Sequence, residues 1–326
     1  MRWLLPCLVL LLTAPLSAQA EELAERAKIR ERVMALVEAD AFDEIERLAA
    51  TWREEETRTS SGLWRLTVMH WALEGTFWVE GPDDPRRAVL EDRLERWAEA
   101  APSSSTRIVA EGYLLHRIAW AVRGNGFANT VSRPAWQGFR EWTAKAINHL
   151  EANRHLAVND PAWWALMVEV HLAAGTSRLI FDRFVAEALE RHPRYYQLHF
   201  HALFYYTPRW YGSPSELDER ARISVEATRE TDGAGLYARS YWYLWQVGER
   251  RDFFERHPVD WPLMRAGIYD VVDVYPADWN LSTFAYFACE MQDRRTYDDL
   301  LARMTGKPEA RIQVSGNMYQ VCRLGE

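Results

Sequence analysis

The sequence is short of cysteine, of lysine and of the alternating apolar pattern that marks strands. Three cysteines in 326 residues are too few for a disulfide framework. Only three of the 39 basic residues are lysine, and the net charge is −8. Binding to nucleic acid depends on basic side chains that neutralise phosphates, so this composition argues against a nucleic-acid partner. No run of basic residues suggests a membrane surface.

Long apolar runs are also missing, with one exception at the start of the chain. Arg2 precedes an apolar run over residues 4–12, and Ala18, Gln19 and Ala20 form a small-x-small cleavage motif. This pattern predicts a signal peptide over residues 1–20. The alternative is an uncleaved anchor, but the run is shorter than the roughly 20 residues that span a bilayer. We therefore expect a periplasmic or secreted chain, residues 21–326, with no stable membrane insertion after cleavage.

Motifs of catalysis and of metal binding are absent from the sequence. There is no His-Glu-x-x-His, no Cys-x-x-Cys, no Gly-x-Ser-x-Gly elbow and no glycine-rich phosphate loop followed by Lys-Ser/Thr. The nine histidines, His199 and His201 among them, do not have the spacing of two ligands on one helix face. We expect no catalytic residue, no metal and no cofactor.

Helical periodicity runs through almost the whole chain. Residues 27–39 carry one apolar stripe, Asp40 and Ala41 break it, and a second stripe starts at Phe42, which predicts a helical hairpin. Further helices are predicted over residues 63–79, 86–100, 106–123, 134–154, 161–174, 179–191, 195–206, 215–231, 236–247, 262–275, 280–291 and 296–304, followed by a short C-terminal helix. Beyond a short hairpin we expect no β-sheet.

The breaks between these helices recur at nearly regular intervals. Pro102, Pro134, Pro161 and Pro193 are 32, 27 and 32 residues apart, close to the ~34-residue period of tetratricopeptide hairpins. The fold class predicted is therefore all-α, a tetratricopeptide-like helical-hairpin solenoid forming one domain. A closed helical toroid is the alternative.

Several short motifs also resemble a bacterial family catalogued as domain of unknown function 4034. They are Trp97 ahead of residues 101–104, residues 119–126, Asp160-Pro161, Pro193 with Tyr195, Pro208-Arg209-Trp210, residues 236–239 and the helix of Cys289. The resemblance covers most of residues 21–326 and implies a tetratricopeptide-like helical fold. It implies no activity. Tyr211 stands where the family pattern has a small residue, which affects the expected conformation of that loop.

Glu169 is the most notable carboxylate in the sequence. The helix around it is apolar on all sides, and a carboxylate in such a place needs a partner or a proton. A structural pair with an arginine is the plain interpretation, and an acid–base or ligand-anchoring role is the alternative. Glu111 is simpler, because Arg107 lies one helical turn before it.

The sixteen tryptophans divide into core candidates and one loop candidate. Trp64, Trp71 and Trp78 lie seven residues apart, and Trp242 and Trp245 three apart, which is the spacing of helix packing. Trp210 instead lies between Arg209 and Tyr211 in the proline-bounded loop of residues 208–214. We predict a binding site there, with Arg123 as partner if both loops project to the same side. The competing interpretation has Trp210 filling a gap in the core and Arg123 paired with a carboxylate.

The two cysteines that remain after cleavage are predicted to pair. Cys289 and Cys322 would lie in an oxidising compartment, close together near one end of the chain. The alternative is two buried free thiols.

Three functions are compatible with these features. The leading expectation is a non-catalytic module that binds an unknown protein or peptide, because helical-hairpin arrays present concave surfaces. A glycan or cell-envelope polymer binder, or a carbohydrate-active enzyme with an aromatic-lined cleft and two carboxylates, is the second. Aromatics and carboxylates converging in one open groove would favour it. A regulatory or immunity role is the third.

Overall fold

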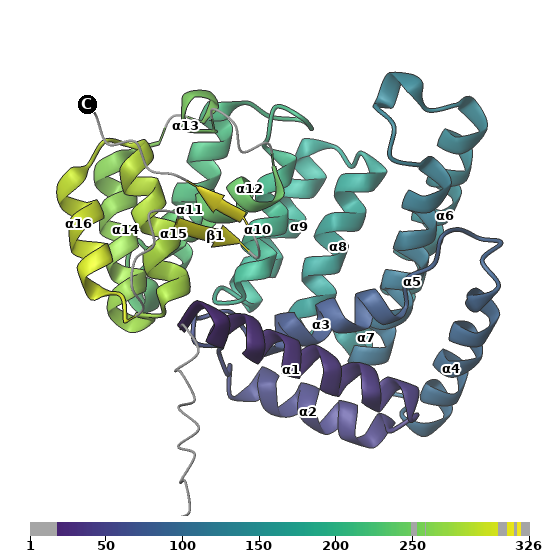
Figure 1. The fold of residues 1–326 in the computed structure, drawn as a ribbon. Helices are drawn as coiled ribbons and strands as arrows, with labels where there is room; N and C mark the ends of the chain where they lie inside the picture. Colours follow the sequence, from purple (N-terminus) through teal and green to yellow (C-terminus); the bar gives the residue numbers. More distant parts are fainter. Residues whose placement is uncertain (1–17, 249–252, 258, 306–311, 316–317, 321–326) are drawn as a thin grey trace, which may run out of the picture.

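Two layers of helices, one inner and one outer, make up this protein (Figure 1). The computed structural model describes residues 18–248, 253–257, 259–305, 312–315 and 318–320. The helices are α1 (Ala18–Glu38), α2 (Phe42–Glu54), α3 (Arg65–Thr76), α4 (Arg86–Ala100), α5 (Ser105–Arg123), α6 (Arg133–Ala152), α7 (Arg154–Ala157), α8 (Pro161–Ala174), α9 (Arg178–Arg191), α10 (Tyr196–Tyr205), α11 (Pro214–Asp232), α12 (Gly235–Val247), α13 (Phe253–Arg256), α14 (Trp261–Val274), α15 (Asp278–Glu290) and α16 (Arg294–Arg303), with a 3₁₀ turn at Ala128–Thr130.

The prediction of an all-α protein is confirmed, and the helices pack in pairs. α5 packs on α6, α8 on α9, α11 on α12, and α15 on α16. The inner helices α3, α5, α8, α10, α12 and α15 are buried over most of their length, whereas outer helices such as α4 and α9 bury only a stripe. Sequence periodicity reflects this difference, because a helix covered on all sides tolerates apolar residues all round.

The inner helices run parallel to one another. Between α3 and α5, His70 contacts Tyr113 and Glu74 contacts Arg117, so both contacts join residues 43 apart. The same spacing joins α10 to α12, where Arg239 lies over Tyr196 and Tyr243 stacks on Phe200. Contacts that advance equally along both helices require a parallel arrangement. The loops that follow the inner helices therefore meet at one rim.

The two ends of the array touch. Ser61, in the loop before α3, accepts hydrogen bonds at its carbonyl oxygen from Arg239 of α12 and Asn280 of α15. The guanidinium of Arg26 in α1 lies 5.0 Å from the ring centroid of Trp279 in α15. The array thus curls back on itself. The tetratricopeptide-like solenoid predicted from the proline spacing stays a prediction.

The predicted short C-terminal helix is wrong. The described residues there form an antiparallel pair of strands, β1 (Ile312–Ser315) and β2 (Met318–Gln320). The sequence carried the signal, since Gly316 and Asn317 separate two short runs and such a pair favours a hairpin turn. β1 lies beside α15.

The predicted pairing of Cys289 with Cys322 falls partly outside the described residues. Cys289 is buried in α15, as expected, and Cys322 lies beyond the described part of the chain. We expect mass spectrometry of the unreduced protein to find one peptide pair joined through these residues, with a bridge worth roughly 3–4 kcal/mol. Two thiols that alkylate in denaturant without reduction would contradict the pairing.

Most of the predicted signal peptide also lies outside the described residues. Residues 1–17 are not described, and the predicted cleavage point after Ala20 falls in the first turn of α1. No helix in the described part of the chain is long and apolar enough to cross a membrane.

Candidate functional site

Four polar side chains, one from each of four inner helices, form a cluster. Glu74 comes from α3, Arg117 from α5, Glu169 from α8 and His201 from α10. Glu74 forms an ion pair with Arg117, and Glu169 Oε1 lies 3.2 Å from His201 Nε2. We call the space above these four side chains the recess.

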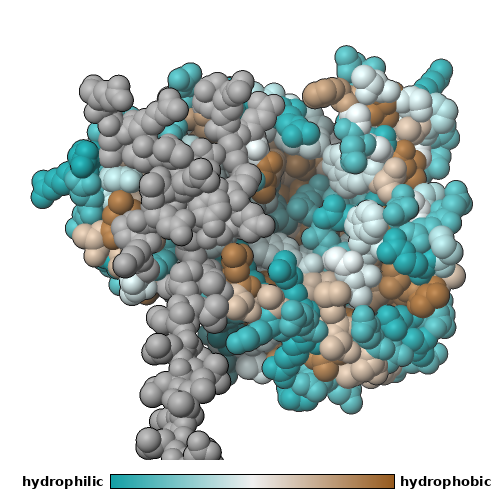
Figure 2. All heavy atoms as spheres, in the orientation of Figure 1, coloured by the Kyte–Doolittle hydropathy of each residue, from teal (hydrophilic) through white to brown (hydrophobic). Residues whose placement is uncertain are grey.

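Part of the surface of this cluster stays uncovered although helices surround it. The Glu169 side chain is 31% exposed, while ten of the fourteen residues of its helix are buried. Space that other atoms do not fill therefore lies beside this carboxylate. Figure 2 shows a hollow on this face beside the lobe of α5 and α6, where hydrophilic and hydrophobic side chains lie together.

Burial controls the ionisation of these groups. Desolvation raises the pKa of Glu169 to about 7, with Arg117 acting in the opposite direction. Desolvation also raises the pKa of Glu74, and the nearby Glu169 adds to that rise, while Arg117 opposes it. His201 moves the other way, since burial lowers its pKa to about 4. Glu169 was expected to pair with an arginine, and the structure places a neutral imidazole against it instead.

Aromatic side chains gather near the rim, where Trp120 lies three residues past Arg117 on α5. Trp120 contacts Trp210 edge-to-face with ring centroids 6.2 Å apart. Arg123 lies over the rings of Trp120 and Trp136 and donates to the carbonyl oxygens of Gly124 and Gly126. The loops of Arg123 and Trp210 therefore do project to the same side, joined through Trp120, which the sequence analysis had not singled out as a site residue.

The predicted loop site is partly buried and partly open. Trp210 is half-buried and packs against the core, whereas Arg209 and Tyr211 are exposed. The Tyr211 ring packs on Tyr205, 4.8 Å between centroids. Gly212 follows them at a point where a Cβ would lie 2.2 Å from the carbonyl oxygen of Tyr206, so only glycine fits. Trp210 has features of both earlier interpretations, since it packs on the core and also borders the recess.

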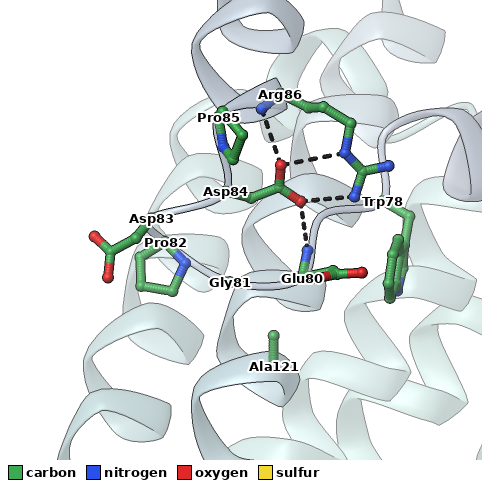
Figure 3. Close-up of a pocket in the computed structure, with 9 residues that line it drawn as sticks. All are labelled: Trp78, Glu80, Gly81, Pro82, Asp83, Asp84, Pro85, Arg86 and Ala121. Carbon is green, nitrogen blue, oxygen red and sulfur yellow. Dashed lines mark hydrogen bonds and ion pairs between the residues drawn. The ribbon is translucent and has the colours of Figure 1, made fainter.

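A second hollow, the loop pocket, opens one helical turn beyond the ion pair. It is a cavity of about 660 Å³ lined by Trp78, residues 80–86 and Ala121. Ala121 lies four residues past Arg117, about 6 Å further along α5, and Trp78 follows the end of α3 at Thr76. Asp84 accepts two side-chain hydrogen bonds from Arg86 (Figure 3). These bonds keep the pKa of Asp84 well below its usual range. The Arg86 guanidinium also lies over the Trp78 ring.

The predicted core position of Trp78 is wrong. It was assigned to the core with Trp64 and Trp71, but it is 42% exposed, whereas Trp64, Trp242 and Trp245 are buried as predicted. α3 ends at Thr76, and the chain turns away before residue 78, so the heptad spacing no longer implies a shared buried face. Sequence spacing alone does not reveal where a helix stops contributing to the core.

Glu111 and several histidines lie as expected. Glu111 pairs with Arg107 at 2.9 Å. His70, His116, His199 and His201 are buried. Among the residues that the structure describes, no three His, Cys, Asp or Glu side chains are grouped so that they could hold a metal ion.

No family model, curated protein or solved structure matches the chain. The resemblance to domain of unknown function 4034 thus stays an expectation from the sequence motifs.

Proposed function

We propose that this chain binds a hydroxyl-rich ligand, a glycan or a fragment of a cell-envelope polymer, in the recess. The observation that supports this most is that two carboxylates, Glu74 and Glu169, lie on inner helices, and that the indoles of Trp120 and Trp210 meet near the rim on which these helices end. Ligand sites of small molecules combine apolar walls with a few placed polar groups.

The floor of the recess offers both hydrogen-bond donors and acceptors. The Arg117 guanidinium donates only and an ionised Glu74 carboxylate accepts only, while the Gln197 amide, which contacts His201, can do both. Sugar hydroxyls also donate and accept, so this mixture suits them better than it suits a purely anionic or cationic ligand. The indoles supply flat apolar surface for the C–H faces of sugar rings.

The loop pocket extends the proposed site. It lies one turn along α5 from Arg117, and its Trp78 side chain is 42% exposed. A ligand of more than one sugar unit could therefore contact both hollows. We further propose that the chain is exported, and that its helical hairpins curl into a tetratricopeptide-like array around the recess.

Binding of a protein or peptide is the second candidate, and exposed rings at the rim favour it. Phe127 is 83% exposed in the loop after α5, and Tyr211 is exposed in the loop after α10. Both loops follow inner helices, so a partner that covers the rim would contact both. Aromatic and arginine side chains are enriched at such contacts.

Replacing Trp210 with alanine tests the glycan proposal. Calorimetry or tryptophan fluorescence would measure binding of soluble oligosaccharides, including β-1,4-linked N-acetylglucosamine and glucose oligomers, to the wild-type chain. For any oligomer that binds, we expect Trp210→Ala to weaken binding about tenfold, equivalent to the loss of roughly 1.4 kcal/mol. The reason is the loss of one wall of the recess.

Trp142 provides the matched control. It is also half-buried, but it lies on the outer helix α6, where it contacts the cations Arg87 and Lys145. Trp142→Ala should leave oligosaccharide affinity unchanged. If Trp210→Ala lowers the melting temperature and leaves affinity intact, Trp210 is a core residue only. Absence of binding by every oligomer would exclude the glycan proposal for that panel and favour the protein-binding alternative.

A further inference from the structure

The loops of Arg123 and Trp210 belong to stretches of the chain that contain no acidic residue. Residues 112–140, which cover most of α5 and the first turns of α6, contain four arginines and no Asp or Glu. Residues 191–215, from the end of α9 to the start of α11, contain three arginines and again no acid. The whole chain has 47 acidic and 39 basic residues. The rim formed by these loops is therefore basic on a protein whose net charge is negative.

Several arginines of this rim lack a carboxylate partner. Arg117 and Arg194 pair with acids from other segments of the chain. Arg123, at the end of α5, forms no ion pair with any carboxylate that the structure describes; its contacts are with carbonyl oxygens and rings. Arg133 and Arg209 are exposed and likewise form no ion pair with a described residue. A ligand with negative charge would find these positive charges uncompensated.

The guanidinium of Arg123 is held by contacts that use only one of its nitrogens. Nη1 donates to the carbonyl oxygens of Gly124, at 2.9 Å, and Gly126, at 3.1 Å. The guanidinium carbon lies 5.3 Å from the ring centroid of Trp120 and 4.9 Å from that of Trp136. Nε and Nη2 have no hydrogen-bond partner among the described residues, and the side chain is only half-buried. These two nitrogens form one edge of a planar group, and two parallel N–H bonds from such an edge match the two oxygens of a carboxylate.

A flat apolar surface adjoins this cation. Trp120 lies one helical turn before Arg123, and its ring meets that of Trp210 edge-to-face, 6.2 Å between centroids. The Trp120 ring is oriented by its own hydrogen bond, since its Nε1 donates to Nε2 of His116 at 3.1 Å. Both indoles are half-buried, so part of each remains uncovered. In an acidic sugar the carboxylate is joined to the ring directly or through a short ether. A sugar ring on an indole thus brings its carboxylate toward the neighbouring guanidinium, which a flexible acidic side chain of a peptide does less well.

We propose that this rim binds the carboxylate of an acidic sugar, with Nε and Nη2 of Arg123 as the donors. The inference rests on the proposed function and narrows its ligand to glycans that contain a uronic acid or an amino sugar with a lactyl ether. Arg123 lies six residues past Arg117, about 9 Å further along α5. The Glu74 carboxylate is paired with Arg117 and therefore repels such a ligand little. Arg209 adds a second, exposed positive charge beside Trp210.

The test compares each acidic probe with its own neutral methyl ester. The probes are an oligogalacturonate and the disaccharide of N-acetylglucosamine and N-acetylmuramic acid, with binding measured by calorimetry. The wild-type chain should bind at least one acid about tenfold or more tightly than its ester, since hydrogen bonds to a charged group are stronger than those to a neutral one. Added salt should weaken binding of the acid and leave binding of the ester unchanged, because salt screens charge.

Replacing Arg123 with glutamine should remove this preference, so that acid and ester bind equally. Arg123→Lys keeps the charge but not the planar edge, and should restore only part of the preference. Arg30→Gln is the control, because Arg30 is exposed on α1 and its loss changes the net charge equally; the preference should persist. Arg209→Gln alters an exposed side chain and should weaken binding of the acid about threefold, which keeps the proposal testable if Arg123→Gln does not fold.

Four results would overturn the inference. Equal affinity of the wild-type chain for acid and ester is one, and a preference that persists in Arg123→Gln is another. Both leave glycan binding intact. Binding of a polyglutamate peptide more tightly than either acidic sugar would assign the rim to a peptide partner. Absence of binding by the acids, their esters and neutral oligosaccharides would remove the proposed function and this inference together.

Discussion

Replacing Glu22 with alanine is expected to lower the free energy of unfolding by about 3–5 kcal/mol, the usual cost of leaving the partner of a buried charge unpaired. Glu22 is fully buried in α1 and accepts hydrogen bonds from the hydroxyls of Thr59, Ser60 and Ser61, from the Ser61 amide and from Arg26. It follows the predicted cleavage point by two residues, so a chain cleaved there would keep it.

Glu22 acts on the closure of the array through the Ser61 loop. The Ser61 carbonyl oxygen accepts from Arg239 and Asn280, so loosening this loop removes contacts between the two ends of the chain. Chemical denaturation of the mature chain measures the change. Glu226→Ala, which removes an exposed ion pair with Arg229, should have no measurable effect. If Glu22→Ala lowers the free energy of unfolding by less than about 1 kcal/mol, Glu22 does not hold the Ser61 loop as proposed.

The same residue predicts loss of stability in acid. Burial acts to raise the pKa of Glu22, but Arg26 and the serine hydroxyls outweigh it, and the folded-state pKa lies below the usual 4.5. A depressed folded-state pKa contributes stability above pH 4.5 that is lost as the pH falls through the folded value. Glu22→Gln should therefore flatten the acid side of the stability profile.

Asp160→Ala is expected to produce a loss of similar size, about 3–5 kcal/mol. Asp160 is buried at the start of α8, where it accepts from the Ala162 amide as a helix cap, from the Ser105 hydroxyl of α5 and from Arg53 of α2. One carboxylate thus joins three helices. Its removal leaves the Arg53 guanidinium without this partner beneath the inner layer.

Two further variants divide this loss into its parts. Asp160→Asn keeps an acceptor for the cap but removes the charge, and should fall between wild type and Asp160→Ala. Ser105→Ala removes one hydrogen bond and should cost about 1 kcal/mol. Denaturation curves with equal slopes allow the comparison. If Asp160→Ala is no less stable than Ser105→Ala, the ion pair with Arg53 contributes nothing.

Local patterns in the sequence predicted most of the helices. The helices over residues 86–100 and 161–174 begin and end where predicted, and Asp160 caps α8 as its position before Pro161 indicated. Apolar periodicity and capping residues act within one or two turns, so a single sequence carries this information. It also predicted that Glu169 would lie on a helix surrounded by apolar residues.

Only the tertiary structure decided which residues share the recess. Glu74, Arg117, Glu169 and His201 are separated by 32 to 52 residues from one to the next, and the parallel alignment of α3, α5, α8 and α10 brings them together. That alignment depends on how the helices cross, which is determined by side-chain packing over the whole inner layer. The helices and the apolar surroundings of Glu169 thus come from the sequence alone. Its neutral imidazole partner, the nearby ion pair and the exposure of Trp78 come from packing between distant segments.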